Sequence, residues 1–387
     1  MARISGSRGA GFQLEIWERE PLWLKLMTPF LKKKRFPTLP EQPETGKWYR
    51  MYAQGCVFAN GEAAYADFCP GTENKLLVFF QGGGVSWNEY TAARPSSLYS
   101  KNMDEGFYMI HVDLFSDLTA GKGILENSQR NPFRGWSKLV LPYSTGDFHA
   151  GSGDFPYTAL DGSRRVLHHH GYRNYRKVME TVTGLVPAPD DLLICGCSGG
   201  GFGAALLADD LMGLYPTCER VVTLVDSGFF RLEGWDAVAK DVWHAPEEIA
   251  SRIHSDNITL DALTALHEKQ GDRVKILFSC SVRDGELARM QNYIDHGAFA
   301  FSKEAGETAQ KNLRQMCNEL RKRIPAVGLF LFDTPNKQHT KEALTNHCTI
   351  GDKTVYEYPV EGLTAAQWVW QAVQGDIRQV GLKLLEQ

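Results

Sequence analysis

The chain has 387 residues, of which 43% are hydrophobic, and its formal net charge is −4 at pH 7. This length and composition allow one large domain with a sizeable core. The mildly acidic balance gives no basic field that would hold nucleic acid, so no nucleic-acid partner is expected.

The N-terminal segment, residues 1–50, is expected to form an arm or cap segment ahead of a single domain over 51–387. Its apolar patch is too short and too polar for a signal peptide or a membrane span. Residues 17–35 combine hydrophobic side chains with the basic run KKKR, a composition that could touch a membrane surface. Pro21, Pro29 and Pro37 interrupt any long helix in this part of the chain and favour an arm packed on its own domain. We therefore expect a cytoplasmic protein without a transmembrane segment.

Cysteine and histidine patterns give little sign of a metal. The eight cysteines include no CxxC pair, which argues against structural zinc. Cys56 and Cys69 flank a predicted turn and are the one local pair that could form a disulfide. The run 168–170 is three histidines, but consecutive side chains point in different directions and do not converge on one ion. No metal site and no cofactor are predicted.

Short apolar runs bounded by turn signals recur along the chain and are typical of strands buried on both faces of a parallel sheet. They lie at residues 75–80, 106–114, 138–143, 191–196, 220–226, 274–280 and 327–333. Helical patterns at 172–185 and 203–215 lie between some of them, and 303–323 is the clearest amphipathic helix. Alternation of this kind predicts a doubly wound α/β fold with a mostly parallel sheet flanked by helices.

Two further segments are polar and helix-prone, around residues 231–270 and 285–325. We interpret them as insertions that form a cap over the carboxyl edge of the sheet. Ligands of open α/β folds bind at that edge.

The stretch GCSGGGFG at 196–203 fits two templates. In the first, Gly199, Gly201 and Ala204 form a dinucleotide fingerprint and Asp226 is the ribose-binding acid of an oxidoreductase. In the second, residues 196–200 form the G-x-S-x-G nucleophile elbow, with Ser198 as nucleophile and the Gly199 N–H as an oxyanion donor.

Other parts of the chain favour the elbow. A run of three glycines after the strand at 75–80 includes Gly83 and Gly84, which can supply the second oxyanion donor. Asp284 follows the strand at 274–280 and is preferred as the acid over Asp226, because the acid usually follows the second strand after the nucleophile. His339 and His347 both follow the last strand, and either can be the base.

Polar and aromatic side chains in the loops after the early strands are candidates for the pocket lining. They are Trp87, Tyr143, Asp147 and His149.

Five segments in one order resemble the pectin acetylesterase and Notum family of α/β-hydrolases, in its bacterial-type branch. They are GGGVSW (82–87), GKGILENSQRNPFRGW (121–136), PYSTGDFHAG (142–151), GCSGGGFG (196–203) and DSGFF (226–230). The resemblance implies hydrolysis of a carboxylic ester, such as an acetyl ester, of a glycan or small molecule through an acyl-enzyme. An acyltransferase on the same triad is the alternative.

The resemblance also selects one of the two histidines. The segment around His347 matches the family's pattern of a histidine followed by an aromatic residue, a V-x-G and a tryptophan, with His339 left as the alternative. Ser86 and Ser144 stand where many relatives carry cysteine, which weakens the case for a disulfide framework.

Overall fold

The computed structural model describes residues 36–96, 106–110 and 119–386. The segment 17–35, whose composition could touch a membrane surface, and most of the predicted arm lie outside the described residues. Within the described part, no helix is both long and apolar enough to span a bilayer.

The core of the fold is a sheet of nine strands among the described residues. From β6 to β13 in the sheet order, neighbouring strands run parallel, whereas β1, β2 and β6 pair antiparallel. In sheet order the strands are β1 (Tyr49–Val57), β2 (Ala63–Cys69), β6 (Ser137–Leu141), β3 (Lys75–Phe80), β9 (Asp191–Cys197), β10 (Arg220–Asp226), β11 (Val274–Ser281), β12 (Gly328–Phe332) and β13 (Gln379–Val380).

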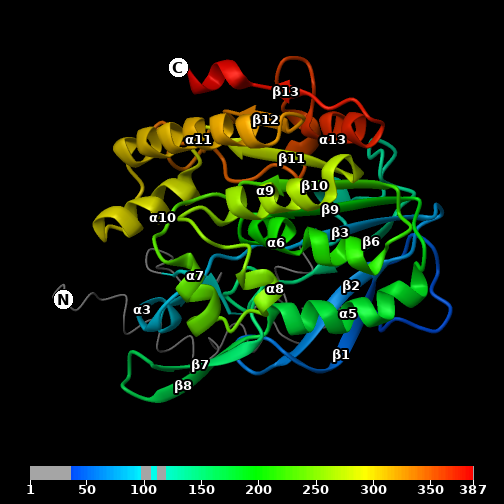
Figure 1. Ribbon diagram of the computed structural model, residues 1–387, viewed down its shortest axis with the longest axis horizontal. Coiled ribbons are helices and arrows are strands. Elements are labelled where there is room, and N and C mark those ends of the chain that lie inside the picture. Colours follow the sequence, from blue (N-terminus) through cyan, green and yellow to red (C-terminus); the bar gives the residue numbers. More distant parts are fainter. Residues whose placement is uncertain (1–35, 97–105, 111–118, 387) are drawn as a thin grey trace.

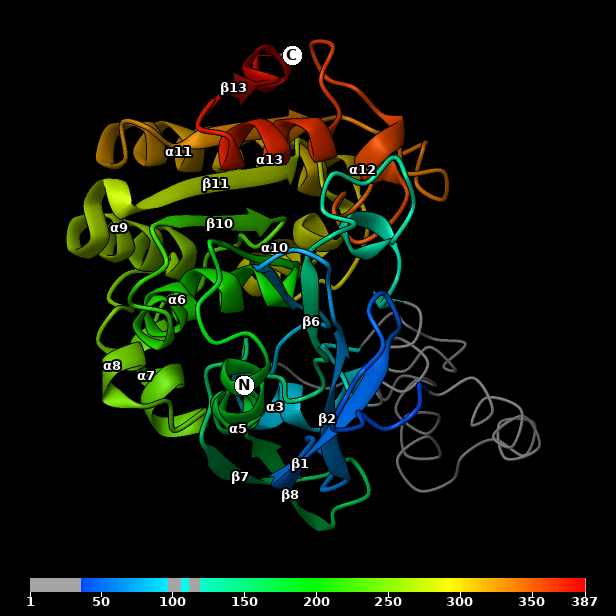
Figure 2. The same ribbon diagram turned by 90° about the vertical axis from the view of Figure 1, so that its right-hand side faces the viewer.

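Helices cover both faces of this sheet (Figures 1 and 2). One face carries α5 (Gly171–Leu185), α6 (Gly199–Leu214), α9 (Ile258–Gln270) and α11 (Lys303–Arg323). The other face carries η2 (Gly123–Leu125), α12 (Thr354–Glu357) and α13 (Ala365–Val373). The predicted α/β-hydrolase architecture, a mostly parallel sheet flanked by helices, is confirmed.

Smaller elements surround this core. They are α3 (Glu89–Ala92), β4 (Pro95–Ser96), β5 (Tyr108–Met109), β7 (Gly153–Thr158), β8 (Arg164–His169), α7 (Trp235–Ala237), η3 (Val238–Val242), α8 (Glu247–Ala250), η4 (Gly271–Arg273), α10 (Gly285–His296) and η5 (Leu382–Leu385).

The near-continuous apolar strands divide their side chains between two hydrophobic cores. In β3, Val78 and Phe80 join the core under α5 and α6, and Leu77 and Phe79 join the core under α13. This division follows from the alternation of side chains along a strand. It explains why strands buried on both faces read as unbroken apolar runs.

The strand predicted over 106–114 is described only as far as residue 110. Within 106–110 the strand is Tyr108–Met109, and it pairs with β4 outside the main sheet, contrary to the prediction. Its backbone is bound to the glycine loop instead, since the Met109 N–H donates to the Gly83 carbonyl at 2.7 Å. The apolar side chains of this segment therefore help to build the site described below.

The two segments predicted as insertions lie in different places. Within them, α9 packs against α6, and α11 packs against both α9 and α10. Both α9 and α11 contribute to the core on the α5 and α6 face of the sheet. In contrast, α10 begins beside the carboxyl end of β11 and contributes side chains to the cavity described below.

The suggested disulfide between Cys56 and Cys69 is absent, and both thiols are free. The antiparallel register pairs Tyr49 with Phe68 at one end of the β1 and β2 hairpin and Val57 with Ala63 at the other. Cys56 and Cys69 therefore lie at opposite ends of the hairpin.

Candidate active site

Ser198 occupies the sharp turn between β9 and α6. Its backbone has φ 55° and ψ −129°, a conformation that non-glycine residues seldom adopt. The Ser198 N–H donates to the Asp226 carbonyl at 2.9 Å, and its own carbonyl accepts from the Gly201 N–H at 2.8 Å. Such local strain persists only where the surroundings enforce it, and it is characteristic of functional sites.

Two glycines allow this turn to close. A Cβ atom at Gly196 would lie 2.1 Å from the Gly200 carbonyl oxygen, and one at Gly200 would lie 2.0 Å from the Phe80 carbonyl oxygen. Both distances are far below van der Waals contact. The positions two before and two after Ser198 therefore require glycine, as the elbow template predicts.

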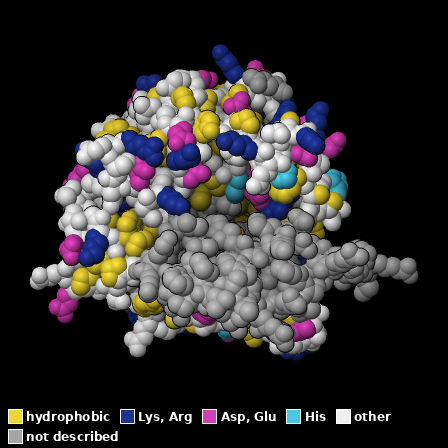
Figure 3. Space-filling model, turned by 180° about the vertical axis from the view of Figure 1, so that it is seen from behind, with side chains coloured by type: hydrophobic (Ala, Val, Ile, Leu, Met, Phe, Trp, Pro, Cys, Tyr) yellow, Lys and Arg dark blue, Asp and Glu magenta, His cyan; other side chains and the backbone are white. Residues whose placement is uncertain are grey.

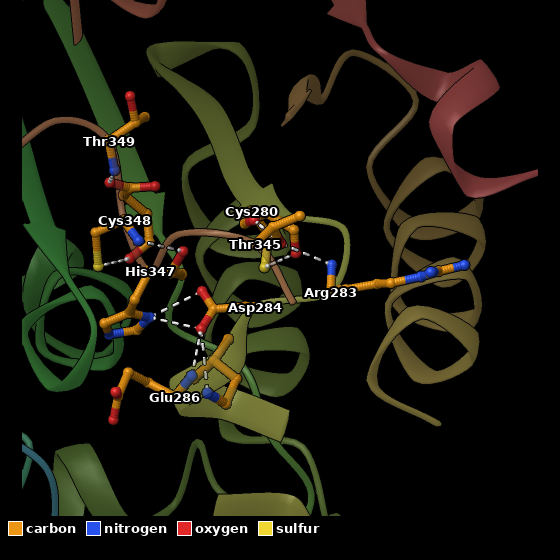
Figure 4. A network of polar contacts seen from close by, with 12 residues as sticks. Cys280, Arg283, Asp284, Glu286, Thr345, His347, Cys348 and Thr349 are labelled. Carbon is orange, nitrogen blue, oxygen red and sulfur yellow. Dashed lines mark hydrogen bonds and ion pairs between the residues drawn. The ribbon is translucent and has the colours of Figure 1, made fainter. Parts of the chain in front are cut away.

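Asp284 and His347 meet at the carboxyl end of β11 (Figure 4). The His347 Nδ1 lies 2.8 Å and 2.9 Å from the two carboxylate oxygens of Asp284. Asp284 also caps α10, since its Oδ1 accepts from the N–H groups of Glu286 and Leu287 at 3.1 Å each. These bonds fix the carboxylate in place, and the carboxylate in turn fixes the imidazole.

The carboxylate of Asp284 changes the protonation of His347. Burial acts to lower the pKa of His347, but the charge and hydrogen bond of Asp284 outweigh it and raise the pKa to about 9. The imidazolium form is thus favoured by its partner, which is the electrostatic arrangement of a histidine that accepts a proton during a reaction.

Asp226 holds the loop that carries His347. Its carboxylate oxygen accepts from the N–H groups of Thr349 and Ile350 at 2.7 and 2.9 Å, and its other oxygen accepts from the Ser279 hydroxyl. Burial raises the pKa of Asp226 above its ordinary value. Its side chain therefore positions the histidine loop through the backbone of Thr349 and Ile350.

The glycine loop lies against the elbow. A Cβ at Gly82 would lie 2.7 Å from the Ser198 Cβ, and one at Gly199 would lie 3.5 Å from the Gly83 nitrogen. Gly84 has φ +78°, and a Cβ there would lie 1.9 Å from the Phe107 carbonyl oxygen. Gly199 is the first residue of α6, so its N–H has no carbonyl partner within the helix.

A cavity of about 460 Å³ opens beside Ser198, and its wall includes both Ser198 and His347. The described wall is mainly apolar and includes Phe107, Met109, Phe148, Phe202, Phe230, Leu287, Met290 and Phe299. The face at the carboxyl end of the strands is hollowed near its centre, with hydrophobic side chains in the hollow (Figure 3). Glu286 and Arg289, which form an ion pair of 2.6 Å, add charge to the same wall.

The four side chains predicted to line the pocket do not reach its described wall. Trp87 packs edge-on against Phe107, and the Tyr143 hydroxyl accepts from the Phe148 N–H at 2.9 Å. Asp147 accepts four hydrogen bonds from its own loop and from the start of α5, and His149 bonds the Gln81 carbonyl at 2.9 Å. These polar and aromatic groups are buried and brace the loops behind the described wall, and their assignment to the pocket stays a prediction.

Burial shifts the pKa values of two of these groups. It raises the pKa of Asp147 to about 6, against the opposing effect of its hydrogen bonds. It lowers the pKa of His149 to about 4, so this imidazole is neutral at ordinary pH. Both are consistent with supporting roles in a dry interior.

The alternatives left open by the sequence occupy other surroundings. His339 stacks on Phe301 with ring centroids 3.8 Å apart and lies 3.7 Å from a Glu342 oxygen, and it is not part of the described cavity wall. Asp226, the ribose-binding acid of the dinucleotide hypothesis, is fully buried and engaged by the histidine loop. The surroundings of His339 do not suit a catalytic base, and those of Asp226 do not suit a ribose-binding acid.

Sequence reasoning missed the aromatic and α10 side chains of the cavity wall. The rings of Phe148, in the loop after β6, and Phe202, in α6, stack with their centroids 4.1 Å apart, although the two residues lie far apart in the sequence. The only signal for Phe230 was its place in the DSGFF segment. Nothing in the pattern of 285–296 showed that Leu287 and Met290 face the elbow.

The site combines a strained serine between strand and helix with a histidine and carboxylate pair that shares its cavity. On this kind of sheet, that combination defines a protein of the α/β-hydrolase class. The pectinacetylesterase family model matches residues 62–262, just over half of the chain. The chain belongs to the pectinacetylesterase family. The matched range includes Ser198 and ends before Asp284 and His347.

Two curated relatives from Arabidopsis thaliana are similar to part of the chain. Pectin acetylesterase 11 is 27% identical over 186 residues, and pectin acetylesterase 7 is 26% identical over 188 residues. Each match covers 46% of this chain and 44% of the relative, so the chain matches less than half of their length.

Among solved structures, the Wnt deacylase Notum from Drosophila is similar in fold. The TM-score is 0.60 at 15% sequence identity, over 86% of this chain and 95% of that one. At this identity the likeness concerns the fold.

Proposed function

We propose that this protein is a serine carboxylesterase with Ser198 as nucleophile, His347 as base and Asp284 as acid. The observation that carries the proposal is the His347 and Asp284 pair at 2.8 Å, which shares a cavity with a strained elbow serine. The names of the similar proteins, pectin acetylesterase and Wnt deacylase, both denote ester or acyl hydrolysis and support the same reaction class.

The first half of the reaction forms an acyl-enzyme. The Nε2 of His347 takes the proton of the Ser198 hydroxyl as its oxygen bonds to the ester carbonyl carbon. The tetrahedral intermediate then collapses, the bond to the alcohol oxygen breaks, and His347 gives its proton to the leaving alkoxide. Asp284 keeps the imidazole in the required tautomer and stabilises the imidazolium.

The second half returns the enzyme to its starting state. Water enters, His347 takes one of its protons, and the hydroxide oxygen bonds to the acyl carbon. The bond to Ser198 then breaks, the serine oxygen regains the proton, and the carboxylic acid leaves. The N–H groups of Gly199 and of Gly83 or Gly84 stabilise the oxyanion in both halves, each worth about 3 kcal/mol of barrier.

The cavity favours an apolar acyl group longer than acetyl. Cavities of a few hundred Å³ hold ligands of drug size, and the wall beside Ser198 is mostly aromatic and aliphatic. We expect kcat/KM for p-nitrophenyl hexanoate to exceed that for the acetate by about tenfold, since each buried CH₂ contributes about 0.8 kcal/mol before losses. Initial rates over the acetate-to-octanoate series measure this preference.

A cavity variant separates the acyl preference from the reaction itself. Met290→Trp should fill part of the cavity and reduce hexanoate hydrolysis more than acetate hydrolysis, whereas Met290→Leu should change neither by much. A strict preference for acetate in the wild-type protein would contradict the acyl proposal and leave the serine mechanism standing. If the wild-type protein hydrolyses none of the esters, both the acyl preference and the serine mechanism are contradicted.

The pH profile should follow the protonation of His347. The base must be neutral, and Asp284 raises the pKa of His347 to about 9. Because the reactive form gains population as the pH rises, kcat/KM should increase through a limb centred above 6.5, the ordinary value for histidine, and extending to about 9. Initial rates between pH 5 and 10 on a p-nitrophenyl ester, corrected for spontaneous hydrolysis, measure it.

Two variants test what causes this rise of kcat/KM with pH. In Asp284→Asn, the remaining activity should rise at lower pH than in the wild type, because the charge that favours the imidazolium is gone. Glu286→Gln should move the rise less, since Glu286 contributes a smaller part of the same effect. A wild-type limb at or below pH 6.5 would contradict the assignment of His347 as base.

A further inference from the structure

The hairpin of β7 and β8 gathers three metal-binding side chains away from the cavity. Asp154 on β7 is the register partner of His168 on β8, and His170 follows two residues later as the residue before α5. His169 between them is buried and bonds the Thr145 carbonyl at 2.7 Å. The sequence argument that consecutive histidines diverge holds for neighbours, but residues two apart share a side, and here a cross-strand carboxylate joins them.

The three ligand atoms already converge. The Asp154 Oδ1 lies 2.7 Å from the His168 Nδ1 and 2.9 Å from the His170 Nε2, and all three ligand atoms lie within 4.8 Å of one another. In a tetrahedral zinc site with bonds of about 2.0 to 2.1 Å, ligand atoms are about 3.3 Å apart. Small side-chain adjustments would bring this set to that spacing.

We propose that Asp154, His168 and His170 bind one divalent transition-metal ion, Zn²⁺ in particular, with water as the fourth ligand. Two imidazoles select such an ion over Ca²⁺ or Mg²⁺, which take oxygen ligands. The Asp154 side chain is 56% exposed, so water reaches the site. Arg173 lies 3.5 Å from the His170 Nε2, and its exposed side chain must swing into solvent when the ion binds.

The metal would stabilise the fold and take no part in the ester reaction. His170 directly precedes α5, and the next N–H, that of Gly171, donates to Asp147 at 2.8 Å. A bound ion would therefore join the hairpin to the start of α5 and to the loop behind the cavity (Figure 1). None of the three ligands lies on the cavity wall described above.

Calorimetric titration of the chelator-treated full chain with ZnCl₂ tests the site. We expect one equivalent at micromolar affinity or better, with a higher melting temperature in Zn²⁺. His168→Ala and Asp154→Asn should each weaken binding at least about tenfold and remove the thermal shift. His296→Ala, an exposed histidine at the end of α10, is the matched control and should bind like the wild type.

Circular dichroism and ester hydrolysis report whether the variants are folded, since His168 and Asp154 belong to neither the cavity nor the catalytic residues. If His168→Ala and Asp154→Asn both still bind one equivalent of Zn²⁺ with unchanged affinity, the proposal is overturned and the ion binds elsewhere. An absence of saturable binding by the wild-type chain would overturn it as well.

Discussion

Replacing Ser198 with alanine is expected to abolish ester hydrolysis while the protein remains folded. The side-chain oxygen is the atom that forms the acyl-enzyme, and removal of one member of a catalytic triad typically lowers kcat by 10⁴-fold or more. Alanine retains the Cβ and fits the same space, so the backbone at φ 55° is as accessible to it as to serine. Turnover of a p-nitrophenyl ester measures the loss, and circular dichroism reports the fold.

Covalent labelling gives an independent readout of the same residue. A fluorophosphonate probe should label the wild-type protein and leave Ser198→Ala unlabelled. Ser251→Ala, at an exposed turn after α8, should be labelled like the wild type. Undiminished turnover in Ser198→Ala, or equal labelling of all three proteins, would refute the assignment of the nucleophile.

The sheet and the elbow could be predicted because short-range rules fix them. The apolar run 191–196 is long enough for one buried strand, and Gly196 is required by a collision with Gly200 inside the five-residue turn. Gly200 is required by the carbonyl oxygen of Phe80 in β3, but the G-x-S-x-G template already includes it. The strand predicted over 106–114 could not be judged in the same way, because its described part pairs with β4 and the glycine loop and not with a strand of the main sheet.

The cavity wall could not be predicted because it depends on which buried polar groups find partners. Asp147 looked like a binding residue, yet it accepts hydrogen bonds from Thr145, His149, Gly151 and Gly171. A buried carboxylate with that many partners is a brace. The wall is built by α10 and by aromatic side chains from separate loops, and no local pattern brings them together.

The histidine cluster escaped prediction for a related reason. The segments 153–158 and 164–169 do not form long apolar runs, so neither strand of the hairpin was expected. Without the register that pairs Asp154 with His168, the carboxylate has no link to the histidines 14 residues further along. Cross-strand neighbours follow from register, and no register could be assigned while neither strand of the hairpin was expected.

Replacing His347 with alanine should lower kcat/KM about 10⁴-fold, whereas His339→Ala should change it less than about threefold. His347 bonds both oxygens of Asp284 and lies on the cavity wall. His339 stacks on Phe301 instead and has no place on that wall. Parallel rates for the two variants on one p-nitrophenyl ester, with fluorophosphonate labelling of each, measure the difference.

The two acids offer the matching comparison. Asp284→Asn keeps the shape of the side chain but removes the charge opposite the imidazole, so catalysis should fall by several orders of magnitude with little change in melting temperature. Asp226→Asn should lower the melting temperature, because its carboxylate holds the N–H groups of Thr349 and Ile350.

For the two histidine variants, equal and mild losses of kcat/KM, or a larger loss in His339→Ala than in His347→Ala, would exclude His347 from the triad.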